Sequence, residues 1–296
     1  MVAPATRSRI TIGDTRVTFV PDGGAWLDPR VVFPASGPDG WDAYRAFLAP
    51  DGRFPVSIGS FLIQAAGRTI LVDLGLGVVD FEVPEIASFR GGRLLRNLAA
   101  EGLTPGQVDT VFFTHLHHDH VGWTSNVAPA PNAEPGQTVT GLTFPEARHV
   151  VAEAEWAHWR GTDELVGPSP TAVQAPLADR LEFVADGEEV APGVRVLATP
   201  GHTPGHSSLL VTDPSGAADE RLIVLGDVMH CQVQVEQSAW SFLFDVDAAQ
   251  GMRTREQLLK ELEDPRTILA GGHFAGEVFG RVLPATARRT WKSRRA

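Results

Sequence analysis

Short apolar runs and stretches of apolar–polar alternation dominate the chain, and both patterns are typical of β-strands. Alternation over residues 8–20 around Gly13-Asp14 predicts a hairpin. Residues 57–65 and 68–74 predict a second strand pair that turns at Ala66-Gly67. Further apolar runs predict strands at 109–114, 148–152, 193–198, 207–212, 221–226 and 266–271.

Apolar residues repeat at helical spacing in fewer places. The clearest such pattern covers residues 247–263, where Asp245 or Asp247 is the expected N-cap. Shorter helices are predicted at 42–49, 94–99 and 153–159. The strands and helices together predict a chain of mixed α and β structure.

No linker, repeat or low-complexity tract divides the sequence, so a single domain is predicted over residues 1–296. Residues 24–56 are rich in proline, glycine and aromatic side chains. We expect this segment to be ordered and to cover part of an active site. Basic residues gather at 285–296, and we expect them to form a solvated tail.

The chain is acidic, with 25 Lys and Arg residues against 36 Asp and Glu residues and a formal net charge of −11. Binding to a nucleic-acid backbone needs clustered basic residues, so nucleic acid is not an expected partner. No apolar stretch approaches the roughly 20 residues that span a bilayer, so no membrane partner is expected. The lone Cys231 excludes an intramolecular disulfide, and the N-terminus lacks an apolar secretory segment, so we expect a cytoplasmic protein.

The strongest chemical signal is His115-Leu116-His117-His118-Asp119-His120, which directly follows the predicted strand 109–114. Four of these side chains, at positions 115, 117, 119 and 120, are of metal-ligating types. They are too many for one tetrahedral metal that also keeps an open position. Two adjacent metals, each with further ligands from elsewhere in the chain, fit this pattern better than a His-rich surface tract.

Three more candidate clusters each follow a predicted strand. They are TPGHTPGH at 199–206, LGD at 225–227 and GGHF at 271–274. Glycine beside each candidate ligand permits sharp turns and close approach of the backbone. Each cluster alone is a weak signal, but four ligand-bearing strand ends in one chain predict a shared metal site.

This ordered set of motifs resembles the metallo-β-lactamase-fold hydrolase superfamily over about residues 57–283. Val72-Asp73-Leu74-Gly75 is similar to the aspartate-bearing turn of that family. The resemblance implies an α/β fold: a four-layer αββα sandwich with a two-metal site at one edge of its two sheets. The segments HVGW, TFPEARHVV, EWAHW and FDVDAAQGMRTR further resemble a bacterial branch that includes lactonase-like and methyl parathion hydrolase-like enzymes.

The resemblance also implies a role for each ligand-type residue. The first metal would take His115, His117 and His202, the second would take Asp119, His120 and His273, and Asp227 would bridge both. His206 would pack or hydrogen-bond behind the ligands. Asp73 would accept a hydrogen bond from a ligand imidazole or a loop amide, which fixes the orientation of the ligand. His118 occupies the variable position of its motif and is expected to point away from the metals.

Two divalent ions in such a site share a water and lower its pKa from 15.7 towards about 7, which makes a bridging hydroxide the nucleophile. Zn is the first expectation, and Mn, Fe or Co also suit these ligands. The resemblance thus implies a metal-dependent hydrolase of esterase or lactonase type. Its substrate would be a small apolar ester, lactone or phosphotriester, and Asp119 would orient the hydroxide and shuttle protons.

Three residues are candidates for substrate contact. Acyl-homoserine lactonases of this superfamily carry a tyrosine three residues after the bridging aspartate, where this chain has His230. We expect His230 to line the pocket and donate a hydrogen bond to a substrate oxygen, which would make it a catalytic residue; an exposed loop position is the alternative. Trp123 and Phe274 lie next to ligand motifs and are the predicted apolar wall, with ordinary core packing as the alternative.

Other members of the superfamily supply competing predictions. They are a glyoxalase II-like thioesterase, a redox enzyme of the persulfide dioxygenase type, and a non-catalytic metal-binding regulatory protein. The complete ligand set weighs against the last of these. The resemblance also suggests a homodimer.

Overall fold

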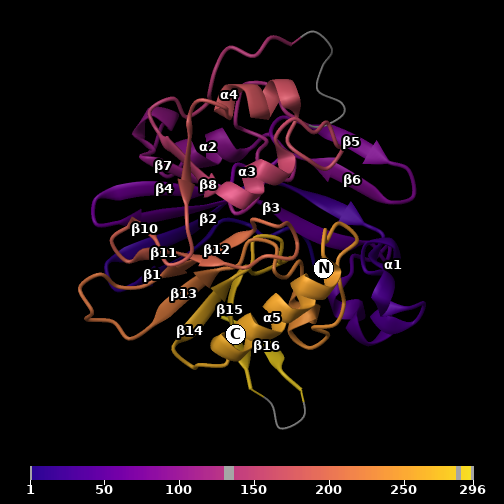
Figure 1. Cartoon of the computed structure of the whole chain (residues 1–296). Helices are drawn as coiled ribbons and strands as arrows, with labels where there is room; N and C mark the ends of the chain where they lie inside the picture. The colour runs from indigo at the N-terminus through magenta and orange to yellow at the C-terminus, as the bar shows by residue number, and fades with distance from the viewer. Residues whose placement is uncertain (1, 130–136, 285–287, 295–296) are drawn as a thin grey trace.

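The computed structural model describes residues 2–129, 137–284 and 288–294. Two β-sheets pack face to face, and helices cover the outer face of each (Figure 1). This is the four-layer αββα sandwich that the sequence motifs imply.

The first sheet is built from the N-terminal part of the chain. Its strands are β1 (Ser8–Ile12), β2 (Thr15–Leu27), β3 (Phe54–Ala65), β4 (Arg68–Val72), β5 (Asp80–Val83), β6 (Ala87–Arg90), β7 (Thr110–Phe112), β8 (Arg148–Ala152) and β9 (Leu181–Val184). They are ordered β5-β6-β2-β3-β4-β7-β8-β9, with β1 beside β2. The neighbours β4, β7, β8 and β9 run parallel, so their carboxyl ends lie at one edge of the sheet.

The second sheet follows along the chain. Its strands are β10 (Glu189–Ala191), β11 (Val194–Ala198), β12 (Ser207–Val211), β13 (Arg221–Val224), β14 (Thr267–Ala270), β15 (Phe279–Leu283) and β16 (Thr290–Ser293), in that spatial order. β12 is antiparallel to both β11 and β13, whereas β13 and β14 are parallel. The carboxyl ends of β11, β13 and β14 therefore share one edge.

Helices form the two outer layers. The α-helices are α1 (Pro29–Val32), α2 (Leu94–Ala99), α3 (Glu153–Trp159), α4 (Ala175–Leu177) and α5 (Ala248–Leu262). The remaining helical segments are not α-helical: they are η1 (Pro34–Ser36), η2 (Gly40–Phe47), η3 (Pro105–Gln107), η4 (Pro170–Gln174) and η5 (Gln232–Val235). Figure 1 shows α2, α3 and α4 above the first sheet and α5 against the second. Within the described residues, none of these helices combines the length and apolar content of a membrane span.

Apolar side chains fill the spaces between the layers. Phe61 of β3 and Phe279 of β15 meet between the two sheets, with ring centroids 5.7 Å apart. Leu94 of α2 and Trp159 of α3 pack on the outer face of the first sheet, and Leu259 of α5 packs on the second. Burial of this kind stabilises a fold by about 25 cal/mol per Å² of apolar surface, so the packed sheets form a rigid support for the loops at their edge.

Most of the elements that alternation and apolar runs predict are present. The hairpin pairs β1 with β2, and the turn between β3 and β4 lies at Ala66-Gly67, where both residues have positive φ. Residue Asp247 caps α5 by accepting the backbone N–H of Gln250 at 2.8 Å, whereas Asp245 is used elsewhere. Strands β5, β6, β9, β10, β15 and β16 were missed because they are short and carry no clear alternation.

In the basic segment 285–296, Arg288, Lys292 and Arg294 are exposed as expected, but the described residues are more ordered than a tail. Its described part forms β16, which pairs with β15, and Arg289 contacts Glu256 and Glu263 on and after α5. Residues 285–287 and 295–296 lie outside the described residues.

Candidate metal centre

The candidate ligands lie at the carboxyl ends of strands in both sheets. The loop that follows β7 carries His115 to His120, and Asp73 directly follows β4, its parallel neighbour. In the second sheet, His202 follows β11, Asp227 follows β13 and His273 follows β14. Because the two sheets face each other, these strand ends bring residues from distant parts of the chain to one place.

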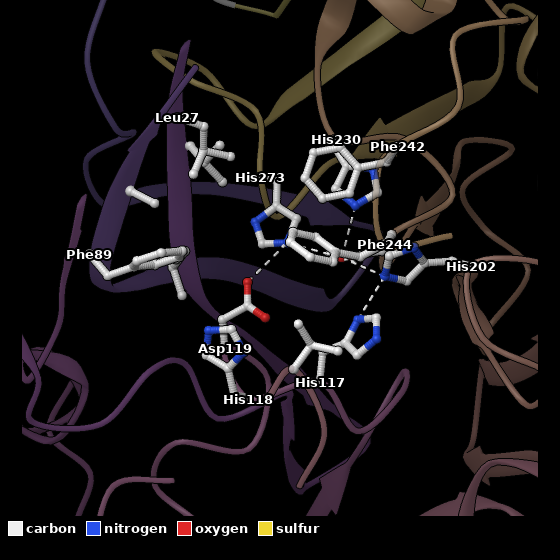
Figure 2. Close-up of a pocket in the computed structure, with 15 residues that line it drawn as sticks. Leu27, Phe89, His117, His118, Asp119, His202, His230, Phe242, Phe244 and His273 are labelled. Carbon is white, nitrogen blue, oxygen red and sulfur yellow. Dashed lines mark hydrogen bonds and ion pairs between the residues drawn. The ribbon is translucent and has the colours of Figure 1, made fainter. Parts of the chain in front are cut away.

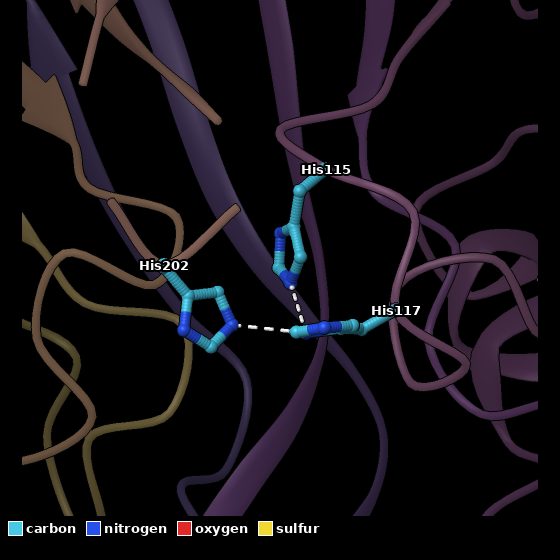
Figure 3. A group of neighbouring side chains, drawn as sticks. All are labelled: His115, His117 and His202. Atoms are coloured by element: carbon cyan, nitrogen blue, oxygen red, sulfur yellow. Dashed lines mark hydrogen bonds between the residues drawn. The ribbon is translucent and has the colours of Figure 1, made fainter. Parts of the chain in front are cut away.

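Three imidazoles form the first ligand group (Figure 3). His115 Nε2 lies 3.0 Å from His117 Nδ1, and His202 Nε2 lies 2.9 Å from the same atom. All three side chains are buried. Asp227 Oδ2 lies 3.3 Å from His202 Nε2 and 3.6 Å from His115 Nε2, so a carboxylate oxygen faces this group.

The second ligand group combines imidazoles with a carboxylate. His120 Nε2 and His273 Nε2 lie 3.2 Å apart. Asp119 Oδ2 lies 3.5 Å from His273 Nε2 and 3.8 Å from His120 Nε2. Asp227 Oδ2, which also faces the first group, lies 3.1 Å from His273 Nε2. The structure therefore brings together all seven residues named as ligands from the sequence, with Asp227 between the two groups.

The hydrogen bonds of the first group fix which ring nitrogens carry protons. The Thr114 hydroxyl donates to Asp73 Oδ2 at 2.8 Å, so it must accept from His115 Nδ1 at 3.0 Å. His202 Nδ1 likewise donates to Asp245 Oδ1 at 2.8 Å. In both rings Nε2 therefore carries a lone pair, and the two lone pairs converge on the third imidazole of the group.

The second group shows the same arrangement. His120 Nδ1 donates to Asp73 Oδ2 at 2.9 Å, and His273 Nδ1 donates to the Ser57 carbonyl oxygen at 2.8 Å. In the neutral form that a metal ligand takes, both Nε2 atoms then face each other with lone pairs, beside the carboxylate of Asp119. Facing lone pairs repel unless a cation lies between them, and imidazole with carboxylate is a donor set that Zn, Mn, Fe and Co accept. The residues of both groups therefore fit a bound divalent cation.

Electrostatics around the two groups support the same conclusion. Burial lowers the pKa of His115 and His117 well below the ordinary histidine value, so both rings are neutral as ligands must be. Burial alone would raise the pKa of Asp227, but the facing imidazoles of His273 and His120 hold that pKa well below its usual range. Asp227 is thus a buried negative charge between the two groups, and, against the effect of burial, the same charge raises the pKa of His120 and His273.

Further buried side chains hold the ligand loops in place. Glu155 of α3 accepts the Leu116 N–H at 2.9 Å and the Trp159 Nε1–H at 2.8 Å through Oε1. Through Oε2 it accepts the Thr203 hydroxyl at 2.6 Å and the Gly205 N–H at 3.1 Å. One carboxylate therefore ties the loop after β7 to the loop after β11. Sequence analysis did not single out this role, because Glu155 lies far from both loops along the chain.

His206 is placed behind the ligands rather than among them. Its Nε2 accepts the backbone N–H of Asp227 at 2.8 Å, and its Nδ1 donates to the Thr199 carbonyl oxygen at 3.0 Å. Gly226 has a φ of 56°, and an added Cβ would lie 2.4 Å from His206 Nε2. The glycine before Asp227 is therefore required for this contact, and His206 fixes the backbone that carries Asp227.

Asp73 and Asp245 orient ligand imidazoles from two sides. Asp73 accepts the Thr114 backbone N–H at 2.8 Å and contacts His120 Nδ1, an amide and a ligand imidazole as the sequence predicted, and it also accepts the Thr114 hydroxyl. Asp245, considered from the sequence only as a helix cap, accepts from His202 and also accepts the Phe242 N–H at 2.9 Å. Such carboxylate–histidine pairs fix the ring orientation and raise the basicity of the ligating nitrogen.

A pocket opens over the two groups (Figure 2). His117, Asp119, His202, Asp227 and His273 face it. Its apolar lining comes from Ala25, Leu27, Val56, Ile58, Phe89, Val166, Phe242 and Phe244. The remaining lining residues are His118 and His230, so no Lys or Arg lines the pocket among the residues that the structure describes.

His230 lies in the pocket beside the shared carboxylate. Its Nε2 is 3.2 Å from Asp227 Oδ2, and its ring stacks on Phe242 with centroids 3.7 Å apart and planes 15° apart. The His230 backbone N–H donates to Gln234 Oε1 at 2.6 Å. The ring is therefore held with one nitrogen toward the ligand groups, and an exposed loop position is excluded by its 2% exposure.

The prediction that Trp123 and Phe274 form the apolar wall is wrong, because neither residue lines the pocket. Trp123 Nε1 donates to the buried Asp22 at 2.9 Å and its ring packs under the helices of the first sheet. The Phe274 ring is fully buried behind the second sheet, 5.3 Å from Trp291. Sequence adjacency to a ligand did not predict which way these rings point.

The segment 24–56 was expected to cover part of an active site. In the structure it contributes side chains to the wall of the pocket and to the cluster behind that wall. Ala25, Leu27 and Val56 line the pocket from β2 and β3. Phe33 and Trp41, from the turns between these strands, pack with Phe242 and Trp240 into an aromatic cluster. This cluster lies behind the Phe242 side of the pocket and supports it.

Comparison with known proteins places the geometry in context. A family model of the Metallo-beta-lactamase superfamily matches residues 53–273. The chain is 27% identical over 224 residues to Beta-lactamase-like protein 2 homolog of Drosophila melanogaster, covering 75% of this chain and 61% of that relative, which is less than two thirds of its length. It is 25% identical over 287 residues to an N-acyl homoserine lactonase of Bacillus sp, covering 91% and 97%.

Solved structures show the same fold at lower sequence identity. AidC, described as a dizinc quorum-quenching lactonase in complex with a product, superposes with a TM-score of 0.80 at 20% identity, covering 99% of this chain and 97% of that one. Hydrolase AbOPH superposes with a TM-score of 0.76 at 23% identity, covering 98% and 97%. The family match spans most of the chain and takes in every candidate ligand, so the protein belongs to the metallo-beta-lactamase superfamily.

Proposed function

We propose that this protein is a dinuclear metal-dependent hydrolase that acts on small, uncharged, apolar esters, lactones or phosphotriesters. The observation that carries the proposal is the pair of ligand groups sharing Asp227 beneath an apolar pocket. The N-acyl homoserine lactonase relative, which matches over most of its length, supports the ester and lactone part of the proposal.

Two divalent ions held by these groups would supply Lewis acidity and an activated water for attack on the substrate. Asp119 is the most exposed ligand carboxylate, with 17% of its side chain accessible against 5% for Asp227. It is therefore the ligand best placed to accept a proton from the attacking water or pass one to the leaving group. His230 faces the same space and is held by Phe242, so it orients a substrate oxygen by hydrogen bonding.

Charge selects the class of substrate. The described lining residues include no Lys or Arg, so a carboxylate on a part of the substrate away from the two ions would lose its hydration without a compensating partner. A glutathione thioester carries such carboxylates, and this disfavours the glyoxalase II-like alternative. Apolar acyl chains, in contrast, gain from contact with Leu27, Phe89 and Phe244.

The test combines metal analysis with a substrate panel. Protein loaded with Zn, Mn, Fe or Co is assayed for bound metal and for turnover of ethyl and thio esters, γ- and δ-lactones, a phosphotriester and an anionic ester. We expect two ions per chain and turnover restricted to neutral substrates. Zn is the first ion to test, since AidC is described as dizinc. Two bound ions without turnover of any ester, lactone or phosphotriester would contradict the proposal and favour a binding protein.

A further inference from the structure

The buried face of α5, a helix that the structure describes over its whole length, carries one charged side chain, Arg255. Only 1% of Arg255 is exposed, and its neighbours along this face are Leu258, Leu259 and Leu262. A guanidinium keeps its charge in a protein, and a buried charge is costly unless it is paired and hydrogen-bonded. The partners that compensate Arg255 therefore indicate what the residue does.

Three backbone carbonyl groups accept hydrogen bonds from Arg255. Its Nε donates to the Val228 carbonyl oxygen at 2.8 Å, and its Nη1 donates to those of Ser238 and Trp240 at 2.6 and 3.0 Å. The planar guanidinium can hold several acceptors at fixed angles, which a lysine ammonium on its flexible stem cannot do. Arg255 thus ties the backbone that follows the ligand Asp227 to the segment that leads to the pocket wall.

The charge of Arg255 faces a carboxylate that orients a candidate ligand. Arg255 Nη2 lies 3.9 Å from Asp245 Oδ2, and each of these side chains is 1% exposed. Asp245 Oδ2 also accepts the Phe242 N–H, whereas Oδ1 accepts from His202 Nδ1 at 2.8 Å. At 3.9 Å the guanidinium and the carboxylate are too far apart for a hydrogen bond, so they interact through their charges.

This buried pair has a consequence for His202. Removal of one partner from a buried ion pair leaves the other charge uncompensated, so Asp245 without Arg255 would have to take up a proton or move toward water. Either change weakens the acceptor that holds His202 Nδ1 and fixes the orientation of its ring. In contrast, no contact described for Arg255 reaches a side chain of the second ligand group or its orienting residue Asp73.

We propose that Arg255 is a positioning residue for the first ligand group. Its charge keeps the Asp245 carboxylate in place, and Asp245 in turn keeps His202 Nε2 directed toward the ion. Arg255 itself touches neither the ion nor the substrate. This inference rests on the proposed two-ion site, and it names a residue on which one of the two ions depends.

The experiment is a double-mutant cycle over Arg255→Met and Asp245→Asn, with the affinity of each ion measured by competition with a chromophoric chelator. Loss of a partner that orients a ligating histidine costs about 10- to 100-fold in metal affinity. Because Arg255→Met leaves the carboxylate itself in place, it should weaken the first ion by about tenfold, at the low end of that range, and the second ion by less than about twofold. In the Asp245→Asn background the same substitution should add less than about twofold, since coupled residues are not additive.

Two further variants separate charge from hydrogen bonding and from loss of stability. Arg255→Lys keeps the charge and should retain most of the affinity for the first ion, whereas Arg255→Gln keeps donors without the charge and should lose it. This comparison also replaces Arg255→Met if that variant does not fold. Arg289→Met is the matched control, because Arg289 pairs with Glu256 and Glu263 and contacts no ligand or orienting residue described for the site. It should leave both affinities unchanged.

Equal weakening of the two ions by Arg255→Met would overturn the inference and indicate that the residue acts through the backbone beside Asp227. Effects of Arg255→Met and Asp245→Asn that add in full, or equal loss in Arg255→Lys and Arg255→Gln, would also overturn it. A wild-type protein that binds fewer than two ions would instead contradict the proposed function. Two bound ions without turnover would contradict only the hydrolase proposal, because the affinities still report on Arg255.

Discussion

The two ligand groups share a carboxylate but differ in composition and support. The first group is built from three imidazoles, and His202 is oriented by Asp245 from a loop before α5. The second group replaces one imidazole by Asp119, whose side chain is partly open to the pocket. Its rings are oriented from the first sheet, by Asp73 after β4 and by the Ser57 carbonyl of β3.

This difference suits the two groups to different tasks: the first group to retaining an ion, and the second to exchanging protons with a substrate. An all-imidazole group with buried rings is suited to retain an ion, because its rings are held by hydrogen bonds and shielded from solvent. A group with a partly exposed carboxylate can exchange protons with a bound substrate. The first group also depends on a loop that lines the pocket. Asp245, which orients His202, lies in this loop between Phe242 and the exposed Val246. Changes in substrate-contacting residues there should reach the first group more than the second.

The largest expected effect comes from removing the oxygen that both groups share. Asp227→Ala should lose both ions and lower kcat/KM by more than about a thousandfold, since the buried charge that holds the two groups together is gone. His273→Ala is the matched control, because it removes a ligand from the second group alone. Metal analysis should find one ion retained in His273→Ala. Equal metal loss in the two variants would show that the groups do not bind ions separately.

A smaller effect should distinguish the two groups through their orienting carboxylates. Asp245→Asn should weaken the ion of the first group, and Asp73→Asn that of the second, each by about 10- to 100-fold. Competition with a chromophoric chelator measures both affinities. Asp73 also accepts from the Thr114 hydroxyl beside His115, so some effect on the first group is expected for Asp73→Asn only. If Asp245→Asn weakened the second ion instead, the assignment of Asp245 to the first group would be wrong.

The smallest expected effect is on the pH dependence of stability, and it comes from His149, which belongs to neither ligand group. It must be known before any pH dependence is assigned to the ligand groups. Burial, and then the charge of Arg180, lower the pKa of His149 from 6.5 to about 4. Between these values the unfolded chain binds more protons than the folded one, so His149 makes stability fall as the pH drops below 6.5. The loss between pH 6 and pH 5 should be about 1 kcal/mol.

His149→Phe should remove that dependence. Chemical denaturation of the wild-type protein and the variant at pH 6 and pH 5 measures the difference. Any pH dependence that remains in His149→Phe then belongs to other groups, including the two ligand groups. The same slope in both proteins would show that His149 is not the titrating residue.

Local motifs made much of the fold and all seven candidate ligands predictable. Each ligand lies within a few residues of an apolar run that forms a strand, as His115 does after β7 and His273 after β14. Each strand, its glycine and its candidate ligand are neighbours in the chain, so a short stretch of sequence is enough to predict all three. The short strands β5 and β6 were not predicted, because their pairing depends on contact with β2 rather than on their own alternation.

Side-chain direction in the pocket was not predictable in the same way. Trp123 and Phe274 stand beside ligands but point into the cores, whereas Phe89 and Phe244, distant from every ligand motif, form the wall. A ring next to a ligand can lie on either side of its loop. Packing against elements far along the chain decides which side it takes.

The sequence by itself determined which residues are the candidate metal ligands, because the ligand-type side chains and the strand ends they follow are neighbours in the chain. Only the tertiary structure decided which carboxylates orient those ligands and which side chains meet the substrate. Asp245 reaches His202 across 43 positions, and Glu155 reaches Leu116 across 39 and Thr203 across 48, so these contacts exist only in the folded chain.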